Sequence, residues 1–168
     1  MSFKEIDIKD LSFSPFEKIG KQWMLITAGN EESFNTMTAS WGGLGVMWNK
    51  NVAFTFIRPS RYTYEFCEHE EYFTLTFFPE EYRKALSFCG TKSGRDFDKC
   101  KETGLTPVFD AEAPYFNEAE LVIVCKKMYA QDMDKASICD DFVNTHYGEN
   151  EPMHRMYVGE IVKAYVKE

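Results

Sequence analysis

The chain has 168 residues, of which 44% are hydrophobic and 27% charged, proportions typical of a folded globular protein. That length suits one ordinary domain, so we expect a single domain over residues 1–168. The formal net charge of -8 disfavours nucleic acids and anionic membrane surfaces as partners, because both are themselves negatively charged.

The first half of the sequence carries strand patterns separated by turn residues. The predicted strands of this half are Gln22–Thr27, Phe34–Ser40, Val52–Ile57 and Tyr72–Phe78. Gly42, Gly43 and Gly45 are expected to interrupt the regular pattern. Ser60 is a good N-cap for a helix over Arg61–Glu68, because its side chain can accept hydrogen bonds from free backbone N–H groups.

The second half combines short helices with longer strands. Pro79 is well placed at the first turn of a helix running through Glu80 to about Phe88, and another helical run ends at Gly104. Asp140–His146 is ambiguous. The predicted strands here are Tyr115–Phe116, Glu120–Tyr129 and Met156–Val166. Closely spaced strands with one or two interposed helices predict an antiparallel barrel or sandwich and disfavour a doubly wound parallel sheet.

The N-terminus and the cysteines indicate a cellular compartment. Met1–Asp10 alternates charged with single apolar residues, unlike the apolar region of a signal peptide. Apolar runs such as Val52–Ile57 fall far short of the ~20 residues of a membrane span. The five cysteines are odd in number and widely spaced, which is typical of reduced cytosolic thiols. We therefore expect a cytoplasmic protein with no membrane contact.

Several other sites of chemistry are not indicated by the sequence. No C-x-x-C or H-x-x-x-H spacing orders Cys139, His146 or His154, so no metal site is expected. Neither a nucleotide P-loop nor a Rossmann fingerprint is present. The acidic runs Glu65–Glu71 and Glu149–Glu151 are expected to be solvated faces.

The segment from Asn35 to Gly43 is suited to a flat heteroaromatic ring. Its hydroxyl side chains can donate or accept hydrogen bonds, Trp41 can lie against a ring, and the paired glycines permit close backbone approach. The alternative is a strand with a glycine turn and a tryptophan in the core.

The segment from Arg58 to Thr63 is suited to a phosphate. Two arginines, two hydroxyls and a phenol precede or open a predicted helix, whose free N–H groups and dipole favour an anion. Arginine can grip phosphate with two parallel hydrogen bonds. Such a basic concentration is unexpected in a chain of charge -8 unless it meets an anion. The alternative is that Ser60 only caps the helix and the arginines form a solvated face.

A third segment, Lys92-Ser93-Gly94-Arg95-Asp96, is a short basic loop that contains glycine. Such a loop can close over a phosphate or a ring edge as a backbone nest. By itself it is more simply a solvated surface turn.

Together the three segments resemble the FMN-binding split-barrel proteins of the flavin reductase and flavoredoxin type, and the resemblance runs from about Trp23 to Gly159. It implies a mainly β fold with a few helices, a Greek-key split β-barrel. It also implies that one segment borders the isoalloxazine ring, a second holds the phosphate and ribityl chain, and a third closes over the cofactor. The residues implied are, in that order, Asn35, Thr38, Ala39, Ser40 and Trp41; Arg58, Ser60, Arg61, Tyr62 and Thr63; and Lys92, Ser93 and Arg95.

The resemblance also singles out His154, since the family tends to carry a histidine shortly before a terminal strand that contains a glycine, here Gly159. His154 is thus the candidate catalytic residue, and a structural histidine is the alternative. Many reductases have Gly-Asp before this histidine, whereas this chain has Pro152-Met153.

The resemblance implies a homodimeric oxidoreductase with FMN as cofactor. Its function would be electron transfer with a redox partner protein, or flavin reduction with NAD(P)H as substrate. The alternative from another class is a non-enzymatic split-barrel module that binds flavin or haem.

Overall fold

The computed structural model describes residues 2–168. Its centre is an eight-stranded sheet in the order β3-β2-β6-β9-β10-β5-β4, with β1 paired to β10, and all its pairings are antiparallel. A separate pair of short strands, β7 and β8, lies beside it. The strands are β1 Phe3–Ile6, β2 Met24–Gly29, β3 Phe34–Ala39, β4 Gly42–Met47, β5 Lys50–Ile57, β6 Tyr72–Phe77, β7 Pro107–Val108, β8 Tyr115–Phe116, β9 Leu121–Asp132 and β10 Arg155–Lys167.

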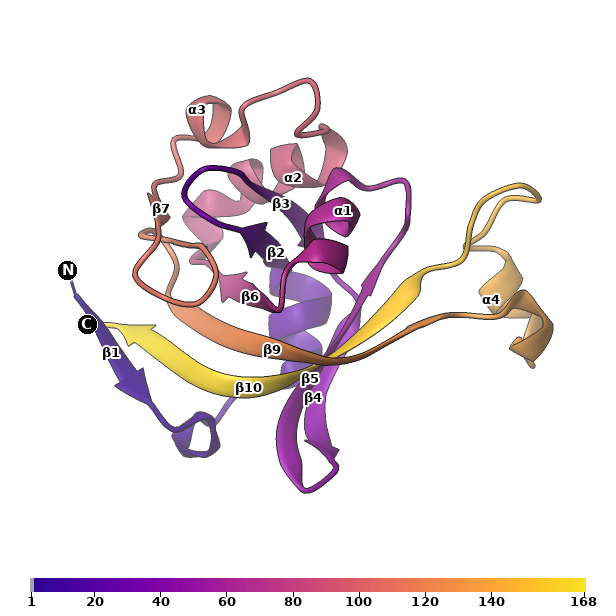
Figure 1. Cartoon of the computed structure of the whole chain (residues 1–168), viewed down its shortest axis with the longest axis horizontal. Coiled ribbons are helices and arrows are strands. Elements are labelled where there is room, and N and C mark those ends of the chain that lie inside the picture. The colour runs from indigo at the N-terminus through magenta and orange to yellow at the C-terminus, as the bar shows by residue number, and fades with distance from the viewer. Residues whose placement is uncertain (1) are drawn as a thin grey trace.

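Short helices connect the strands and cover part of the sheet (Figure 1). The α-helices are α1 Tyr62–His69, α2 Arg83–Thr91, α3 Lys99–Thr103 and α4 Asp141–Asn144; a π-helix spans Phe16–Gln22, and 3-10 turns span Ile8–Asp10, Glu80–Tyr82 and Lys135–Ser137. Both α1 and α2 pack against β2 and β3. No helix among residues 2–168 combines the length and apolar character needed to cross a bilayer.

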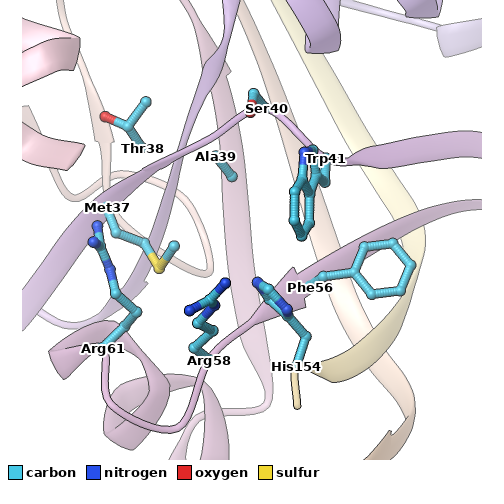
Figure 2. A pocket seen from close by; sticks show the side chains of 9 residues that line it. All are labelled: Met37, Thr38, Ala39, Ser40, Trp41, Phe56, Arg58, Arg61 and His154. Carbon is cyan, nitrogen blue, oxygen red and sulfur yellow. The ribbon is translucent and has the colours of Figure 1, made fainter. Parts of the chain in front are cut away.

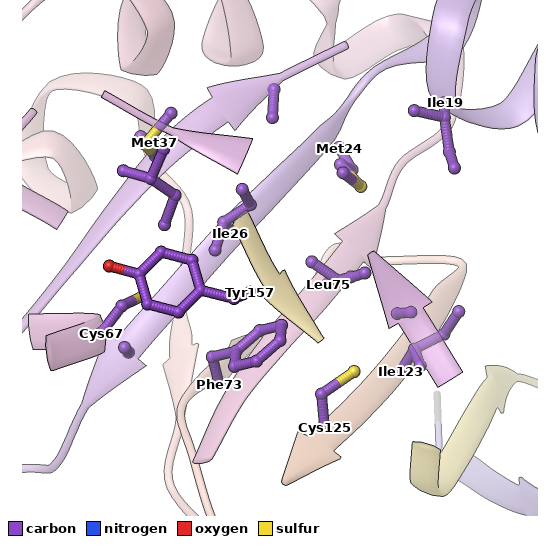
Figure 3. Packing of buried hydrophobic residues seen from close by; sticks show 14 of the residues in the cluster. Ile19, Met24, Ile26, Met37, Cys67, Phe73, Leu75, Ile123, Cys125 and Tyr157 are labelled. Carbon is purple, nitrogen blue, oxygen red and sulfur yellow. The ribbon is translucent and has the colours of Figure 1, made fainter. Parts of the chain in front are cut away.

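Two apolar clusters bury both faces of the central strands. Alternation along β2 sends Ile26 into one cluster and Leu25 into the other, as the two-residue period of a strand requires. The first cluster, which includes Phe73 and Tyr157, is enclosed by the curled sheet (Figure 3). The second lies under α2 and includes Leu86. Burial on both faces fixes the positions of β2 and β3, on which the candidate site is built.

The longest strands, β9 and β10, run side by side out of the barrel and carry the segment 133–154 with α4 at their far end (Figure 1). Gly159 lets β10 cross the core, because a Cβ there would lie 2.7 Å from both Cys125 Cβ and Phe73 Cζ. The structure is thus mainly β with few helices, as predicted, and the predicted strands are present with shifts of a few residues at their ends.

The prediction that glycines interrupt the pattern at positions 42–45 was wrong, since Gly42–Met47 forms β4. A two-residue turn at Trp48 and Asn49, with φ of 51° and 58°, joins β4 to β5. Gly42 is needed for close approach, because a Cβ there would lie 2.7 Å from the carbonyl oxygen of Phe54. The backbone of the paired strand β5 therefore explains this glycine.

The prediction that Ser60 caps the first helix was also wrong. Helix α1 begins at Tyr62, and Arg61 occupies the N-cap position without a side-chain capping bond. The helix predicted from Glu80 begins as a 3-10 turn and continues as α2. The ambiguous segment Asp140–His146 contains the single turn α4.

Candidate functional site

A first pocket of about 200 Å³ opens where β3 ends and β10 begins (Figure 2). Its walls include the connection between β3 and β4, the end of β5 and the residue before β10. Figure 2 shows Arg58, Arg61 and His154 pointing toward the Thr38–Trp41 segment. The lining residues are Met37, Thr38, Ala39, Ser40, Trp41, Phe56, Arg58, Arg61 and His154.

Trp41 and His154 form the aromatic side of the first pocket. Their ring centroids lie 5.0 Å apart at a tilt of 50°, and His146 approaches the same indole at 5.5 Å. Trp41 remains 43% exposed, which is unusual for so large an apolar side chain. The indole is therefore available to a further flat group.

His154 is buried and uncharged at neutral pH. Burial lowers its pKa to about 4, and the neighbouring Arg58 cation lowers it in the same direction. The Tyr147 hydroxyl lies 2.8 Å from Nδ1 of His154. A neutral imidazole can therefore present one hydrogen-bonding nitrogen to the pocket.

Arg58 is held by the segment that precedes β10. Its guanidinium donates to Oε2 of Glu151 at 2.6 Å and to the carbonyl oxygen of His146 at 2.8 Å. Glu151 is thus an ion-pair partner, which corrects the prediction that Glu149–Glu151 is only a solvated face. The carboxylate offsets the arginine charge next to the first pocket.

A second pocket of about 160 Å³ lies between the start of α1 and the end of α2. It shares Met37 and Arg61 with the first pocket, so the two are adjacent. The lining residues are Asn35, Met37, Ser60, Arg61, Tyr62, Thr63, Thr91, Lys92, Ser93, Gly94 and Lys99.

Two cationic side chains of the second pocket are held by backbone carbonyl oxygens, mainly at the end of α2. Arg61 donates to the carbonyl oxygen of Gly90 at 2.7 Å, and Lys99 donates to the carbonyl oxygens of Cys89 at 2.9 Å and Thr36 at 2.6 Å. Terminal helix carbonyls lack helical partners and carry partial negative charge, which suits cations. Among residues 2–168, neither Arg61 nor Lys99 forms an ion pair with Asp or Glu. The pocket therefore keeps most of their positive charge.

Lys99 is a buried lysine, only 6% exposed. Burial lowers its pKa to about 8, and nearby Arg61 also lowers it. A buried ammonium whose pKa is depressed gains most from an anion in contact with it. This side chain is the clearest indication that the second pocket fits an anion.

The loop after α2 is locked against β3 and α1. Asn35 donates to the Thr63 hydroxyl at 2.8 Å, and a Cβ on Gly94 would lie 2.0 Å from Oδ1 of Asn35. Arg95 lies over the Tyr62 ring, 4.7 Å from its centroid, and forms an ion pair with Glu65. The acidic run Glu65–Glu71 is therefore more than a solvated face.

The structure brings the predicted site residues together around the two pockets. Thr38, Ala39, Ser40, Trp41, Arg58 and His154 line the first; Asn35, Ser60, Tyr62, Thr63, Lys92 and Ser93 line the second; Arg61 lines both, and Arg95 lies beside the second. Arg58 lies with the residues predicted for the ring, although its sequence neighbours lie at the second pocket.

Sequence reasoning missed Met37, Phe56, Thr91, Gly94 and Lys99. Met37 and Gly94 stand between predicted residues, so strand and loop continuity was a usable signal. Lys99 gave no such signal, because nothing in Asp98–Glu102 separates it from Lys101, which is exposed. Within residues 2–168, no three His, Cys, Asp or Glu side chains group as metal ligands.

The first pocket is aromatic on one side and the adjoining second pocket is cationic, an arrangement that can accept a flat ring that carries a phosphate. The chain belongs to the flavin reductase like domain family, whose model matches residues 16–168. The antiparallel sheet matches solved FMN-binding split-barrel structures, which confirms the predicted fold and family.

Three solved structures illustrate the likeness. Flavoredoxin from Methanosarcina acetivorans has a TM-score of 0.69 and 22% identity, over 88% of this chain and 69% of that one. An FMN-binding domain of a flavin reductases-like enzyme from Shewanella baltica has a TM-score of 0.70 and 13% identity, over 98% and 77%. The NADH:FAD oxidoreductase SgcE6 from Streptomyces globisporus has a TM-score of 0.64 and 15% identity, over 87% and 74%. No curated protein sequence matches this chain.

Proposed function

We propose that this protein is an FMN-binding flavoprotein and an oxidoreductase. The observation that carries the proposal is the adjacency of the two pockets, which share Met37 and Arg61 and differ in chemistry. A phosphate in the second pocket would meet cations that have no acidic partner among the described residues, while a ring in the first would meet Trp41. Membership of a family that includes oxidoreductases supports the same function.

Each pocket has a distinct role in this proposal. In the second, Arg61, Lys92 and Lys99 hold the phosphate by charge, and Ser60, Thr63 and Ser93 supply hydroxyls. In the first, the Thr38–Trp41 segment borders the ring, and neutral His154 adds one polar group. Bound FMN would supply the hydride and electron chemistry, and the protein would supply position and electrostatics. A bound phosphate would give the Lys99 ammonium an anionic partner.

The electron donor and acceptor define two forms of this function. In one, NAD(P)H is the substrate and reduced flavin is the product; in the other, FMN stays bound and electrons pass between protein partners. The charged second pocket favours retained FMN, because charge-assisted contacts bind more strongly than neutral ones.

We also propose a homodimer of single-domain subunits in the cytoplasm. The support for the dimer is an exposed apolar surface on the β4–β5 hairpin and β9, where Val46, Trp48 and Tyr129 are 73%, 50% and 40% exposed. Exposed aromatic side chains of this kind are typical of interfaces. The variant Trp48→Glu should shift the mass measured by light scattering toward the monomer.

A visible absorption spectrum tests the function directly. The purified protein, or protein mixed with FMN, should show flavin absorption that bleaches with NADH, NADPH or a reduced ferredoxin. A colourless protein that also fails to bind added FMN would contradict the proposal. Bound flavin that none of these reductants bleaches would favour the non-enzymatic binding module.

A further inference from the structure

Tyr147 lies outside the first pocket and contacts two of its lining residues. It belongs to the segment between α4 and β10. Its hydroxyl is 2.8 Å from Nδ1 of His154, and the two rings meet edge to face with centroids 5.5 Å apart. The Arg58 guanidinium lies 5.3 Å from the centroid of the Tyr147 ring. Tyr147 is therefore held in place beside His154.

This contact decides which nitrogen of His154 carries the proton. A phenol hydroxyl is a stronger donor than acceptor, and the unprotonated nitrogen of a neutral imidazole is a strong acceptor. The favoured arrangement is therefore Tyr147 O–H donating to Nδ1, which leaves the proton on Nε2. The ring makes no other hydrogen bond within residues 2–168, and His154 lines the first pocket. Nε2–H is thus free to donate to a group in that pocket.

We propose that Tyr147 is a positioning residue that holds His154 as the Nε2–H tautomer, so that His154 donates a hydrogen bond to a carbonyl oxygen or ring nitrogen in the first pocket. The identity of that acceptor as a flavin atom rests on the proposed function. The tautomer itself does not.

The surroundings keep this donor uncharged over the physiological range. The groups that face or adjoin the imidazole are the Arg58 cation, the Tyr147 phenol and the Trp41 indole, with His146 beyond the indole and Glu151 beyond Arg58. Burial and the cation both oppose protonation, and the pKa of His154 lies at about 4. The Nε2–H donor should therefore be unchanged from pH 5.5 to pH 8.

Nuclear magnetic resonance of the flavin-free protein tests the tautomer. Nitrogen-15 labelling of histidine, with His154 assigned from the missing signals of His154→Gln, should show a single Nε2–H form in the wild type. Tyr147→Phe removes only the hydroxyl and should give a mixture of both neutral tautomers. Tyr129→Phe is the matched control, since its hydroxyl bonds Gln131 on the surface, and it should leave His154 unchanged. An Nδ1–H form in the wild type, or an unchanged single form in Tyr147→Phe, would overturn the proposal.

Ligand titration tests the donor. Tyr147→Phe should weaken the binding of FMN and of riboflavin by the same factor, about two- to tenfold. The reason is that one neutral hydrogen bond is lost in the molecules whose His154 adopts the other tautomer. His154→Gln should bind more tightly than His154→Phe, since its amide restores an N–H donor. Affinities that stay unchanged in Tyr147→Phe would overturn the donor role. Failure of the wild type to bind either flavin would instead refute the proposed function, and the tautomer measurement would still stand.

Discussion

The two pockets hold their cations in different ways. Arg61 and Lys99, at the second pocket, donate to backbone carbonyls at the end of α2 and on β3. Arg58, at the first, is bound by the Glu151 carboxylate and a carbonyl of an irregular segment. Backbone carbonyls position a cation without cancelling its charge, whereas a carboxylate cancels it. The second pocket therefore keeps more uncompensated positive charge than the Arg58 side of the first, which is why the proposed function places the phosphate in the second pocket and the ring in the first.

The variant Arg61→Ala should have the largest effect on this difference between the two pockets. Loss of a charge-assisted contact from a partly buried site should weaken the binding of FMN by about 100-fold, roughly 3 kcal/mol. Riboflavin has the same ring without the phosphate, so its affinity should change by less than about threefold. Titration of both ligands by flavin fluorescence measures this ratio. Equal losses for both would show that Arg61 supports the site only through its bonds to α2.

The pH dependence of FMN affinity is the next largest effect, and Lys99 is its source. The folded protein without ligand loses the Lys99 proton near pH 8, whereas a bound phosphate would keep the lysine charged. FMN affinity should therefore fall about tenfold between pH 7 and pH 9, and riboflavin affinity should not.

Lys99→Met is the control for this effect, because it keeps an unbranched side chain and removes the charge. It should bind FMN more weakly at pH 7 and show a flat profile up to pH 9. The same pKa shift also affects stability. Since the unfolded chain holds the proton up to about 10.5 and the folded chain only to about 8, the free energy of unfolding should rise with pH across that window. A slope in FMN affinity that persists in Lys99→Met would assign it to another group.

Trp41→Leu tests the ring side of the comparison and should have a smaller effect. Replacing an aromatic face with an aliphatic side chain should cost about 0.5–1.5 kcal/mol, about two- to tenfold in affinity. The loss should be the same for FMN and riboflavin, in contrast to Arg61→Ala. A loss confined to FMN would place Trp41 at the phosphate instead.

The sequence predicts an element of secondary structure well when the interactions that determine it are local. Alternation in Phe34–Ser40 and the short apolar run Val52–Ile57 predict two strands, because both patterns are local properties. Gly42 misleads, since its cause is the close backbone of Phe54 on the paired strand β5, which the local pattern does not show. Ser60 also misleads, because the helix begins at Tyr62 and Arg61, not Ser60, occupies the N-cap position.

The site follows the same rule. Thr38–Trp41 and Arg61–Thr63 form contiguous motifs, so the sequence predicts them as groups, and the fold then places them around adjacent pockets. Lys99 and Tyr147 escape prediction because their roles arise from tertiary contacts: Lys99 bonds the carbonyl oxygens of Thr36 and Cys89, and Tyr147 bonds His154. No spacing in the sequence encodes either contact.

The smallest predicted effect comes from Glu151→Gln, which removes the negative charge beside Arg58 and keeps the side-chain shape. The Glu151 side chain is 52% exposed, and an ion pair in solvent contributes about 0–1 kcal/mol. Arg58 also keeps its bond to the His146 carbonyl, so stability should change little. The released charge lies beside the first pocket, not the second, so FMN affinity should rise by less than about threefold and less still at high salt. Titration at two salt concentrations measures this. A gain above tenfold would mean that Arg58, and not only Arg61 and Lys99, pairs with the phosphate, and the division of charge between the two pockets would be wrong.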